Sequence, residues 1–452
     1  MLNRMSVAVA LLLVLVTCAA SSSPPTTRLD SGTIQGYHND GVDIYRGVPY
    51  ASPPVGTLRF KNAIPPLNWT GHRDTTTDGA ACPQRCKLPA AACPPTQDES
   101  CLYLNVFVPA LSSSSKDRTL LPILFWIHGG DYYQGYGGGL LYDGTSLASN
   151  ENVIVVSINY RLGALGFLYS GPNPKTQFTG NYGISDQQEA LRWVQRNAKA
   201  FGGNPDQVTI FGQSAGGESV GTLLNMASSK GLFSKAIAQS FPVGFPLREA
   251  AAAPVSKLCI PFVVAVVNHF LNLCFLFLPH SSLPPPFFSP SFFHQSFTKV
   301  VAKDAGCDVS SPYETCMMNL TWEEVLAGAI KAETNVVAEL GTFLDLFQPY
   351  GPTAGTPELP YQLMEGFLSG DALDLPLILG SVRQEGMIFI YEAFSKPVAR
   401  AEEDALLVAI FGLKDIEKVL KQYPRNPAHY KDLRNHTVRR HCLLLLLDCV
   451  DW

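Results

Sequence analysis

One serine and two neighbouring glycines have the types and spacing that acyl transfer requires. Gly212-Gln213-Ser214-Ala215-Gly216 follows a short apolar run and precedes a stretch of small residues. A serine on such a strand-to-helix turn is held in a strained backbone conformation, which exposes its hydroxyl above the edge of a sheet. The start of the following helix favours developing negative charge. Ser214 is therefore predicted to be a nucleophile; the alternative is an ordinary glycine- and serine-rich turn.

Upstream, His128-Gly129-Gly130 ends another apolar run. Glycine lets the backbone approach a reacting carbonyl because no Cβ stands in the way. Loops of this type supply backbone N–H groups to an oxyanion hole, together with the N–H of the residue after the nucleophile. The predicted oxyanion hole comprises Gly129, Gly130, Asp131 and Ala215; the alternative is a flexible turn.

Strand and helix signals alternate from about residue 100 to 240 and would position these residues. The apolar runs Pro122 to His128 and Val153 to Asn159 are typical of buried parallel strands. Three further elements follow. Asp186 to Phe201 has the spacing of a helix, Val208 to Phe211 is a short strand, and Ala215 to Met226 is a helix of small residues. This order predicts an α/β fold with a large, mostly parallel central sheet flanked by helices.

The composition limits the possible functions. The 452 residues suffice for one large α/β domain or two ordinary ones, and 46% of them are apolar. The net charge of −5 and the 16% of charged residues give no indication of a nucleic-acid partner or an anionic membrane surface.

The N-terminus predicts secretion. Arg4, the apolar run Val7 to Val16 and the small residues after it are typical of a signal peptide over residues 1–20. A membrane anchor is the alternative, but the run is short for a bilayer span. Eleven cysteines fit an oxidising compartment. Sequons for N-glycosylation begin at three asparagines, Asn68, Asn319 and Asn435.

With four further segments, these motifs resemble the type B carboxylesterase and cholinesterase family. The segments are Tyr45 to Gly56, Glu99 to Asn105, Gly180 to Gly183 and Phe201 to Pro205. The resemblance covers residues 30–254 and 296–436, and it implies the α/β-hydrolase fold. It also implies a Ser–Glu–His triad that acts on small-molecule carboxylic esters through an acyl-enzyme, without a metal or an organic cofactor.

The family pattern further implies two disulfides and the acidic member of the triad. The disulfides are Cys82–Cys101 and Cys307–Cys316; Cys86 and Cys93 are extra to this pattern, and whether they pair with each other stays open. The acid is Glu385, which follows the apolar strand Leu375 to Gly380. A carboxylate there would orient and support an imidazolium. Gln384 replaces the usual acidic neighbour, and the alternative for Glu385 is a solvated loop residue.

The family's catalytic histidine is not found. It should follow the acid in chain order, but His429, His436 and His441 all lack the family's sequence context. We expect the C-terminal part of the fold to be missing, and residues 437–452 to be an aberrant tail. Asp131 also departs from the family, which usually has glycine there. A carboxylate about 5 Å from the oxyanion would cost about 3 kcal/mol at an effective dielectric constant of ~20.

Residues 255–295 interrupt the resemblance with an apolar, aromatic and proline-rich segment. The codons for the residues at its two ends can have the sequences of splice sites, so we interpret the segment as a retained intron. A membrane segment over residues 258–278 is the rival interpretation. Pro261 and polar residues such as Asn268 within that segment argue against it.

The sequence therefore predicts a secreted serine carboxylic ester hydrolase, with the hydrolase domain split over residues 21–254 and 296–436. This chain is predicted to be inactive if the histidine is absent. The rival hypothesis is a non-catalytic, cholinesterase-like adhesion or binding protein similar to neuroligins. Ser214 and Glu385 favour the enzyme, whereas Asp131 and the missing histidine favour the rival. The sequence makes no prediction of oligomeric state.

Overall fold

The structure, a computed structural model, describes residues 23–110, 119–243, 247–250, 290–310, 312–339 and 348–382, and beyond them residues 391, 396–401, 403, 404 and 421. It describes no side chains for residues 290–296 and 334–339. Several predictions therefore lie outside the described residues. These are the signal peptide, most of the segment 255–295, Glu385, the three C-terminal histidines, Asn435 and the tail.

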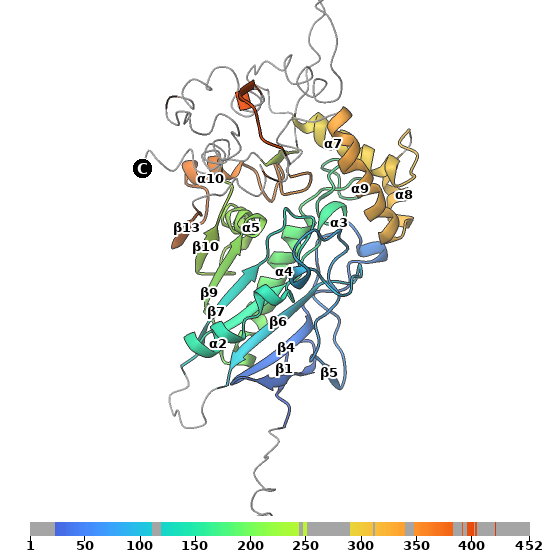
Figure 1. The fold of residues 1–452 in the computed structure, drawn as a ribbon. Coiled ribbons are helices and arrows are strands. Elements are labelled where there is room, and N and C mark those ends of the chain that lie inside the picture. Colours follow the sequence, from blue (N-terminus) through green and yellow to red (C-terminus); the bar gives the residue numbers. More distant parts are fainter. Residues whose placement is uncertain are drawn as a thin grey trace, which may run out of the picture.

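An eight-stranded sheet runs through the molecule in the order β13-β10-β9-β7-β8-β6-β4-β3 (Figure 1). Its strands are β3 (Tyr37–Asn39), β4 (Val42–Pro49), β6 (Tyr103–Pro109), β7 (Leu121–Ile127), β8 (Ile154–Ile158), β9 (Gly203–Gln213), β10 (Lys235–Gln239) and β13 (Leu377–Gly380). The strands from β13 to β8 are parallel, and those from β6 to β3 continue the sheet antiparallel.

Two small sheets lie beside the large one. The first joins β1 (Thr26–Arg28), β2 (Thr33–Gln35) and β5 (His72–Asp74), and the second pairs β11 (Arg248–Glu249) with β12 (Thr353–Ala354). Short 3₁₀ helices occupy Gly56–Leu58, Ala90–Ala92, Leu140–Tyr142, Ala198–Phe201 and Ala227–Ser229.

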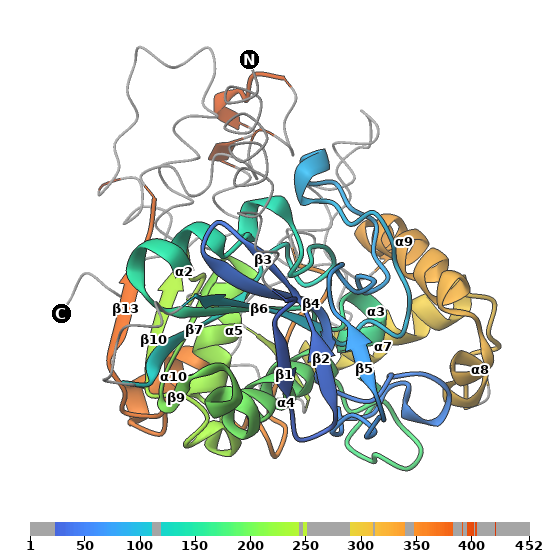
Figure 2. The same ribbon diagram turned by 90° about the horizontal axis from the view of Figure 1, so that it is seen from below.

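Helices cover both faces of the large sheet. They are α2 (Thr145–Glu151), α3 (Gly163–Phe167), α4 (Tyr182–Asn197), α5 (Ala215–Leu224), α7 (Pro290–Asp304), α8 (Glu314–Asn319), α9 (Trp322–Glu339) and α10 (Leu363–Ser369). Figure 2 shows α2 on one face of the sheet and α4 and α5 on the other. The α7–α9 group lies beside α3 at one side of the molecule (Figure 1).

The alternation of side chains along the strands explains why helices pack on both faces of the sheet. Ile44, Phe107 and Val155 pack with Ala148 of α2 in a small apolar cluster. The neighbouring Val106 and Val156 belong to the main core on the other face. Because successive side chains of a strand point to opposite faces, a strand that is apolar at consecutive positions is buried on both sides. The continuous apolar runs in the sequence therefore correctly indicated a sheet covered on both faces.

The predicted elements are present, with shifted boundaries. The run from residue 122 forms β7, the run from 153 forms β8, and the helical segment from 186 forms α4 and the 3₁₀ turn after it. The short strand predicted over residues 208–211 is longer, because β9 begins at Gly203, which pairs with Leu121 of β7.

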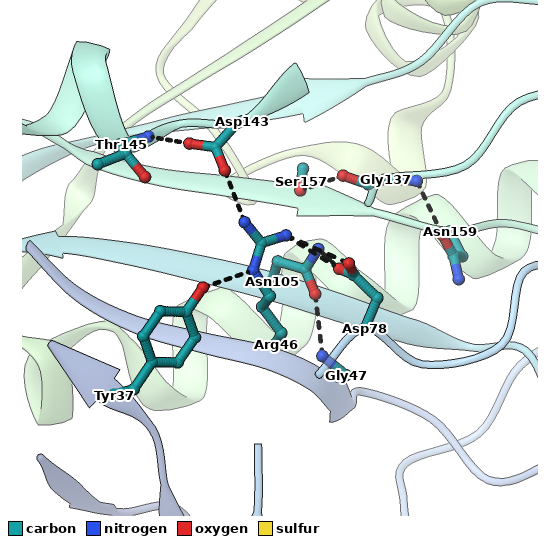
Figure 3. Close-up of polar contacts among 10 residues, drawn as sticks. All are labelled: Tyr37, Arg46, Gly47, Asp78, Asn105, Gly137, Asp143, Thr145, Ser157 and Asn159. Atoms are coloured by element: carbon teal, nitrogen blue, oxygen red, sulfur yellow. Dashed lines mark hydrogen bonds and ion pairs between the residues drawn. The ribbon is translucent and has the colours of Figure 1, made fainter. Parts of the chain in front are cut away.

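A polar network fastens the segments around the predicted site to the sheet (Figure 3). Arg46 of β4 forms ion pairs with Asp78 at 3.1 Å and with Asp143 at 2.6 Å. Further along the loop after β7, Gly137 donates its N–H to Asn159 and accepts a hydrogen bond from Ser157. This loop also carries Gly129 and Gly130, so its far end is held on β8 and the chain just after it.

Three disulfides join neighbouring loops: Cys82–Cys101, Cys86–Cys93 and Cys307–Cys316. The first and third are the pairs that the family resemblance implies, and the second joins the two cysteines whose pairing the sequence left open. Arg59 ties the N-terminal half to the segment that follows the third disulfide. It donates two hydrogen bonds to Glu99, and another to the carbonyl of Met317 at 3.2 Å.

Helix α7 begins at Pro290, within the segment interpreted as a retained intron. From Phe297 onward its side chains enter the core, and Thr298 donates a hydrogen bond to the carbonyl of Tyr169 at 2.7 Å. The interpretation of residues 255–295 as a retained intron stays a prediction. In the part of the chain that the structure describes, no helix is long and apolar enough to cross a membrane.

Candidate active site

Ser214 occupies the turn between β9 and α5 in a conformation that serine rarely adopts. Its backbone angles are φ 57° and ψ −124°. Its N–H donates to the carbonyl of Gln239 at the end of β10, and its own carbonyl accepts from the N–H of Glu218. These two hydrogen bonds hold the turn in place, so the serine lies at the carboxyl end of the parallel strands, where α/β folds bind ligands.

Small residues make this turn possible. A Cβ at Gly212 would collide with the backbone of Gly216, and a Cβ at Gly216 would collide with the carbonyl of Ile127. Strand β9 and helix α5 therefore approach each other more closely than any side chain would allow. This close approach is the reason that the glycines flank Ser214.

The Gly129–Gly130 loop reaches Ser214 because of the sheet register. Ile127, the last residue of β7, pairs with Gly212 in the neighbouring parallel strand. The chain after each strand therefore emerges at the same edge of the sheet. A Cβ at Gly129 would lie 3.2 Å from the Cβ of Ser214. The structure thus brings Gly129 and Ser214 together.

Left-handed backbone conformations shape the rest of this loop. Gly130 has φ 113°, and Asp131 and Tyr132 have φ 52° and 58°. The carbonyl of Gly130 accepts hydrogen bonds from the N–H groups of Tyr133 and Gln134, each at 3.1 Å. Asp131 therefore adopts a conformation that favours glycine, the residue that the family pattern has there.

His128 is locked beneath the loop. Its Nδ1–H donates to the carbonyl of Gly129 at 2.9 Å, and its ring stacks on Tyr160 with the centroids 4.4 Å apart. The hydroxyl of Tyr160 donates to the carbonyl of His128. Burial lowers the pKa of His128 to about 4, so the imidazole is neutral near pH 7. His128 therefore supports the loop and is too weak a base to activate a serine.

Glu218 is a buried carboxyl that the motif analysis did not single out. It lies one helical turn after Ser214, and its Oε2 accepts a hydrogen bond from Gln348 at 3.0 Å. Among the residues that the structure describes, its Oε1 has no hydrogen-bond partner. Burial raises the pKa of Glu218 to about 8; the Gln348 hydrogen bond opposes this rise and Asp131 adds to it. The glutamate is therefore largely protonated at pH 7.

Glu218 could have been found from the sequence as the one charged residue of a helix made largely of small and apolar residues. Every residue of α5 is buried. Its partner Gln348 could not have been found, because it lies 130 residues away. Among the described residues, no cluster of three or more His, Cys, Asp or Glu could hold a metal ion.

A family model described as "Carboxylesterase family" matches residues 23–251 of this chain. The para-nitrobenzyl esterase of Bacillus subtilis is 34% identical over 397 residues, which are 87% of this chain and 70% of that protein. Neuroligin-2 of Mus musculus is 42% identical over 228 residues, 43% of this chain and 27% of its own length.

Solved structures agree with the sequence matches. The carboxylesterase EST55 of Geobacillus stearothermophilus superposes with a TM-score of 0.71 at 28% identity, over 94% of this chain and 75% of that chain. The chain spans 64 to 70% of the length of three relatives that it matches over most of its own length. The fold is thereby confirmed as that of the α/β-hydrolase carboxylesterases. This chain belongs to the carboxylesterase family.

Proposed function

We propose that the protein is a secreted serine esterase in which Ser214 attacks a carboxylic ester. The observation that carries this proposal is the strained turn at Ser214, within reach of the Gly129 loop. Strain of this kind is maintained only where the surrounding structure enforces it, and it is concentrated at functional sites.

In the proposed reaction, Ser214 Oγ bonds to the ester carbonyl carbon as a base takes its proton. The backbone N–H groups of Gly129, Gly130, Asp131 and Ala215 face the oxyanion. The C–O bond to the alcohol then breaks, and the alcohol leaves with a proton. Water attacks the acyl-enzyme, releases the acid and restores the serine. Glu385 would orient that base, which is a histidine in the family pattern.

Secretion and glycosylation are part of the same proposal. Three disulfides favour an oxidising compartment. Asn68 and Asn319 are exposed, as glycosylation requires, whereas Asn435 lies outside the described residues. Treatment of the secreted protein with a peptide N-glycosidase should lower its apparent mass, and Asn68→Gln and Asn319→Gln should each remove part of that difference.

A fluorophosphonate probe tests the nucleophile directly. It should label Ser214 in the full-length gene product, and Ser214→Ala should abolish labelling and most turnover of short acyl esters. The matched control is Ser240→Ala, a serine that also has positive φ but follows β10. Activity retained in Ser214→Ala would overturn the assignment.

The second candidate function is a non-catalytic adhesion or binding protein. Asp131 favours it, because its carboxylate stands on the loop that would face the oxyanion, and the match to neuroligin-2 fits it. A folded, disulfide-bonded full-length protein that resists the fluorophosphonate probe would support this candidate.

A further inference from the structure

The Cys86–Cys93 disulfide is extra to the family pattern and closes a short loop at the surface. The two cysteines are 7 residues apart in the chain, and both are partly exposed. Residues 89–91, at the tip of the loop, are exposed. In the first disulfide, by contrast, Cys82 and Cys101 are at most 1% exposed. A dissolved thiol therefore has access to the outer bond and not to the inner one.

The charges around Cys86 favour a thiolate there. Arg85 and Lys87 flank Cys86 in the chain, and both side chains are exposed. Cations beside a cysteine stabilise its thiolate and make it the better leaving group in thiol–disulfide exchange. At the other end of the bond, the carbonyl oxygen of Leu88 lies 3.3 Å from Cys93 Sγ, where its partial negative charge disfavours a thiolate. The exchange therefore has a direction: an incoming thiolate attacks Cys93, and Cys86 leaves.

Glu333 of α9 faces these cations across a narrow pocket that Arg85, Lys87 and Glu333 all line. Burial raises the pKa of Glu333 to about 7, and Lys87 and Arg85 oppose this rise. The carboxyl is therefore only partly ionised near pH 7. It cancels part of the positive charge at this end of the disulfide and leaves a net positive charge.

The third disulfide has different surroundings. Cys307 is 5% exposed and precedes Asp308 in the chain. A carboxylate beside a cysteine disfavours its thiolate, because the two negative charges repel each other. Neither Cys307 nor Cys316 has a cation as its neighbour in the sequence. Exposure and charge together thus distinguish Cys86–Cys93 from the two other disulfides.

Hydrogen bonds connect the loop of this disulfide to the candidate active site. The backbone N–H of Lys87 donates to Oε1 of Gln134 at 2.7 Å. The backbone N–H of Gln134 in turn donates to the carbonyl of Gly130 at 3.1 Å. Closer to the sheet, the side chain of Gln84 exchanges two hydrogen bonds with the backbone of Gly135. Opening the disulfide removes a constraint on Lys87, which makes the outermost of these contacts, and leaves the inner ones in place.

We propose that the Cys86–Cys93 disulfide is a redox switch at the edge of the candidate active site. A thiolate of an external dithiol bonds to Cys93 Sγ, the bond between the two cysteine sulfurs breaks, and Cys86 leaves as a thiolate that takes up a proton. The second thiol of the reductant then displaces Cys93, so the dithiol ends as a disulfide and both cysteines end as thiols.

Reduction frees the chain from Lys87 to Ala92 and weakens its contact with Gln134. The exchange does not involve Ser214, so this inference stands whether or not the proposed function does.

Mild reduction of the folded full chain with dithiothreitol, followed by alkylation and mass mapping, tests the access of a dithiol. Cys86 and Cys93 should become alkylated at least about tenfold faster than the four cysteines of the other two disulfides, because the outer bond is exposed and has the better leaving group. Equal rates at Cys82 and Cys101 would mean that reduction follows unfolding, and would overturn the inference.

The monothiol 2-mercaptoethanol, with rapid alkylation, tests the direction of the exchange. The mixed disulfide should form mainly on Cys93 and the free thiol on Cys86, because the attacked sulfur keeps the incoming thiol. Arg85→Gln/Lys87→Gln should slow the exchange about twofold to fivefold at low salt and less at high salt. Lys175→Gln, an exposed lysine elsewhere, is the matched control. A mixed disulfide mainly on Cys86, or an unchanged rate in the double variant, would refute the directed exchange.

Hydrogen exchange of a variant without this disulfide tests the connection to the candidate active site. In Cys86→Ser/Cys93→Ser, the backbone amide of Lys87 should exchange at least about tenfold faster, as expected when one hydrogen bond is weakened. The amide of Gln134 should change in the same direction. Replacing both cysteines of the third disulfide, which spans 9 residues, by serine is the matched control and should leave both amides unchanged. Unchanged exchange at Lys87 in the Cys86→Ser/Cys93→Ser variant would show that the disulfide does not hold this contact, and the proposed switch would fail.

Discussion

Gly129 and Ser214 approach so closely that no side chain fits between them. A Cβ built on Gly129 would meet the carbonyl of Gln213, and it would lie 3.2 Å from the Cβ of Ser214. The two residues follow the ends of neighbouring parallel strands, β7 and β9, so the sheet register sets their separation. Any substitution at Gly129 must therefore move the loop or the serine.

Gly129→Ala is expected to damage the site. The added methyl group would displace the backbone N–H groups of the loop, and loss of one oxyanion-hole donor costs a factor of about 10²–10³ in rate. Fluorophosphonate labelling of Ser214 in the full-length gene product should slow by at least about a hundredfold. Gly380→Ala is the control, because nothing lies within 4 Å of a Cβ at that position. Equal labelling rates in the two variants would contradict the expectation.

Ser214→Gly should stabilise the fold while it removes the hydroxyl. Strain at a non-glycine residue with positive φ costs roughly 1–3 kcal/mol. Glycine removes this strain, but the greater conformational freedom of its unfolded chain reduces the gain in stability by about 0.5–1 kcal/mol. Ser214→Ala keeps the strain and is the matched control. In denaturant titrations, Ser214→Gly should be about 1 kcal/mol more stable than Ser214→Ala. The opposite order would mean that the turn is not strained.

Local sequence signals predicted the turn and the helices around it. The apolar positions Ala190, Leu191, Val194 and Ala198 of the predicted helix are all buried. The helix nevertheless begins earlier, at Tyr182, directly after the left-handed Asn181. Its polar residues Gln187 and Glu189 are buried too. Buried polar residues on a helix are invisible to hydrophobic spacing, because their partners come from elsewhere in the chain.

Contacts between distant segments could not be read from the sequence. Arg161 forms a buried pair with Asp186, with hydrogen bonds of 2.7 and 2.8 Å, and holds the chain after β8 to α4. Nothing in the local sequence marks either residue as a partner of the other. The Glu218–Gln348 pair is similar. The disulfide pairings, in contrast, followed from the family resemblance, and the structure contains them.

Glu218 should make the protein less stable at alkaline pH. The folded state keeps the glutamate protonated to about pH 8, whereas its ordinary pKa is 4.5. Because the folded state binds the extra proton, the contribution of Glu218 to stability is fully present below pH 4.5 and is lost as the pH rises to about 8, on the order of a few kcal/mol. Glu218→Gln does not titrate, so it should remove this part of the pH dependence.

Thermal unfolding from pH 5 to pH 9 measures the effect of Glu218. The difference in stability between the unmodified protein and Glu218→Gln should grow in favour of the variant as the pH rises. Glu151→Gln, at an exposed position in α2, is the control and should show no such trend. A constant difference across the range would show that the folded pKa of Glu218 is not raised.

The esterase is not expected to prefer choline esters. In cholinesterases an aromatic residue of the first disulfide loop contacts the quaternary ammonium. Here the loop from Pro83 to Ser100 contains no Trp, Tyr or Phe, and it places Arg85 and Lys87 at the rim of the neighbouring pocket. Steady-state kinetics on acetylcholine and a neutral isostere of the same shape should favour the isostere. A strong preference for acetylcholine would refute this prediction.

Three histidines have side chains that the structure describes, and none of them offers Ser214 an adequate base. His38 and His72 are exposed on β3 and β5, and His128 is buried with its Nδ1–H donated to Gly129. The low pKa of His128, about 4, makes it a poor proton acceptor near pH 7. A neutral serine hydroxyl needs such an acceptor to attack an ester. His436 and His441 lie outside the described residues.

We therefore expect this chain, expressed as given, to show little or no ester turnover. The measurement is a burst assay with an activated ester on folded protein, whose disulfides are verified beforehand by mass spectrometry. The chain should give no burst, because attack by Ser214 without a general base is slow. A burst near one equivalent would contradict the prediction. If His436→Ala or His441→Ala then abolished that burst, the variant would identify the base, and a burst that survived both would leave His429 for the same test.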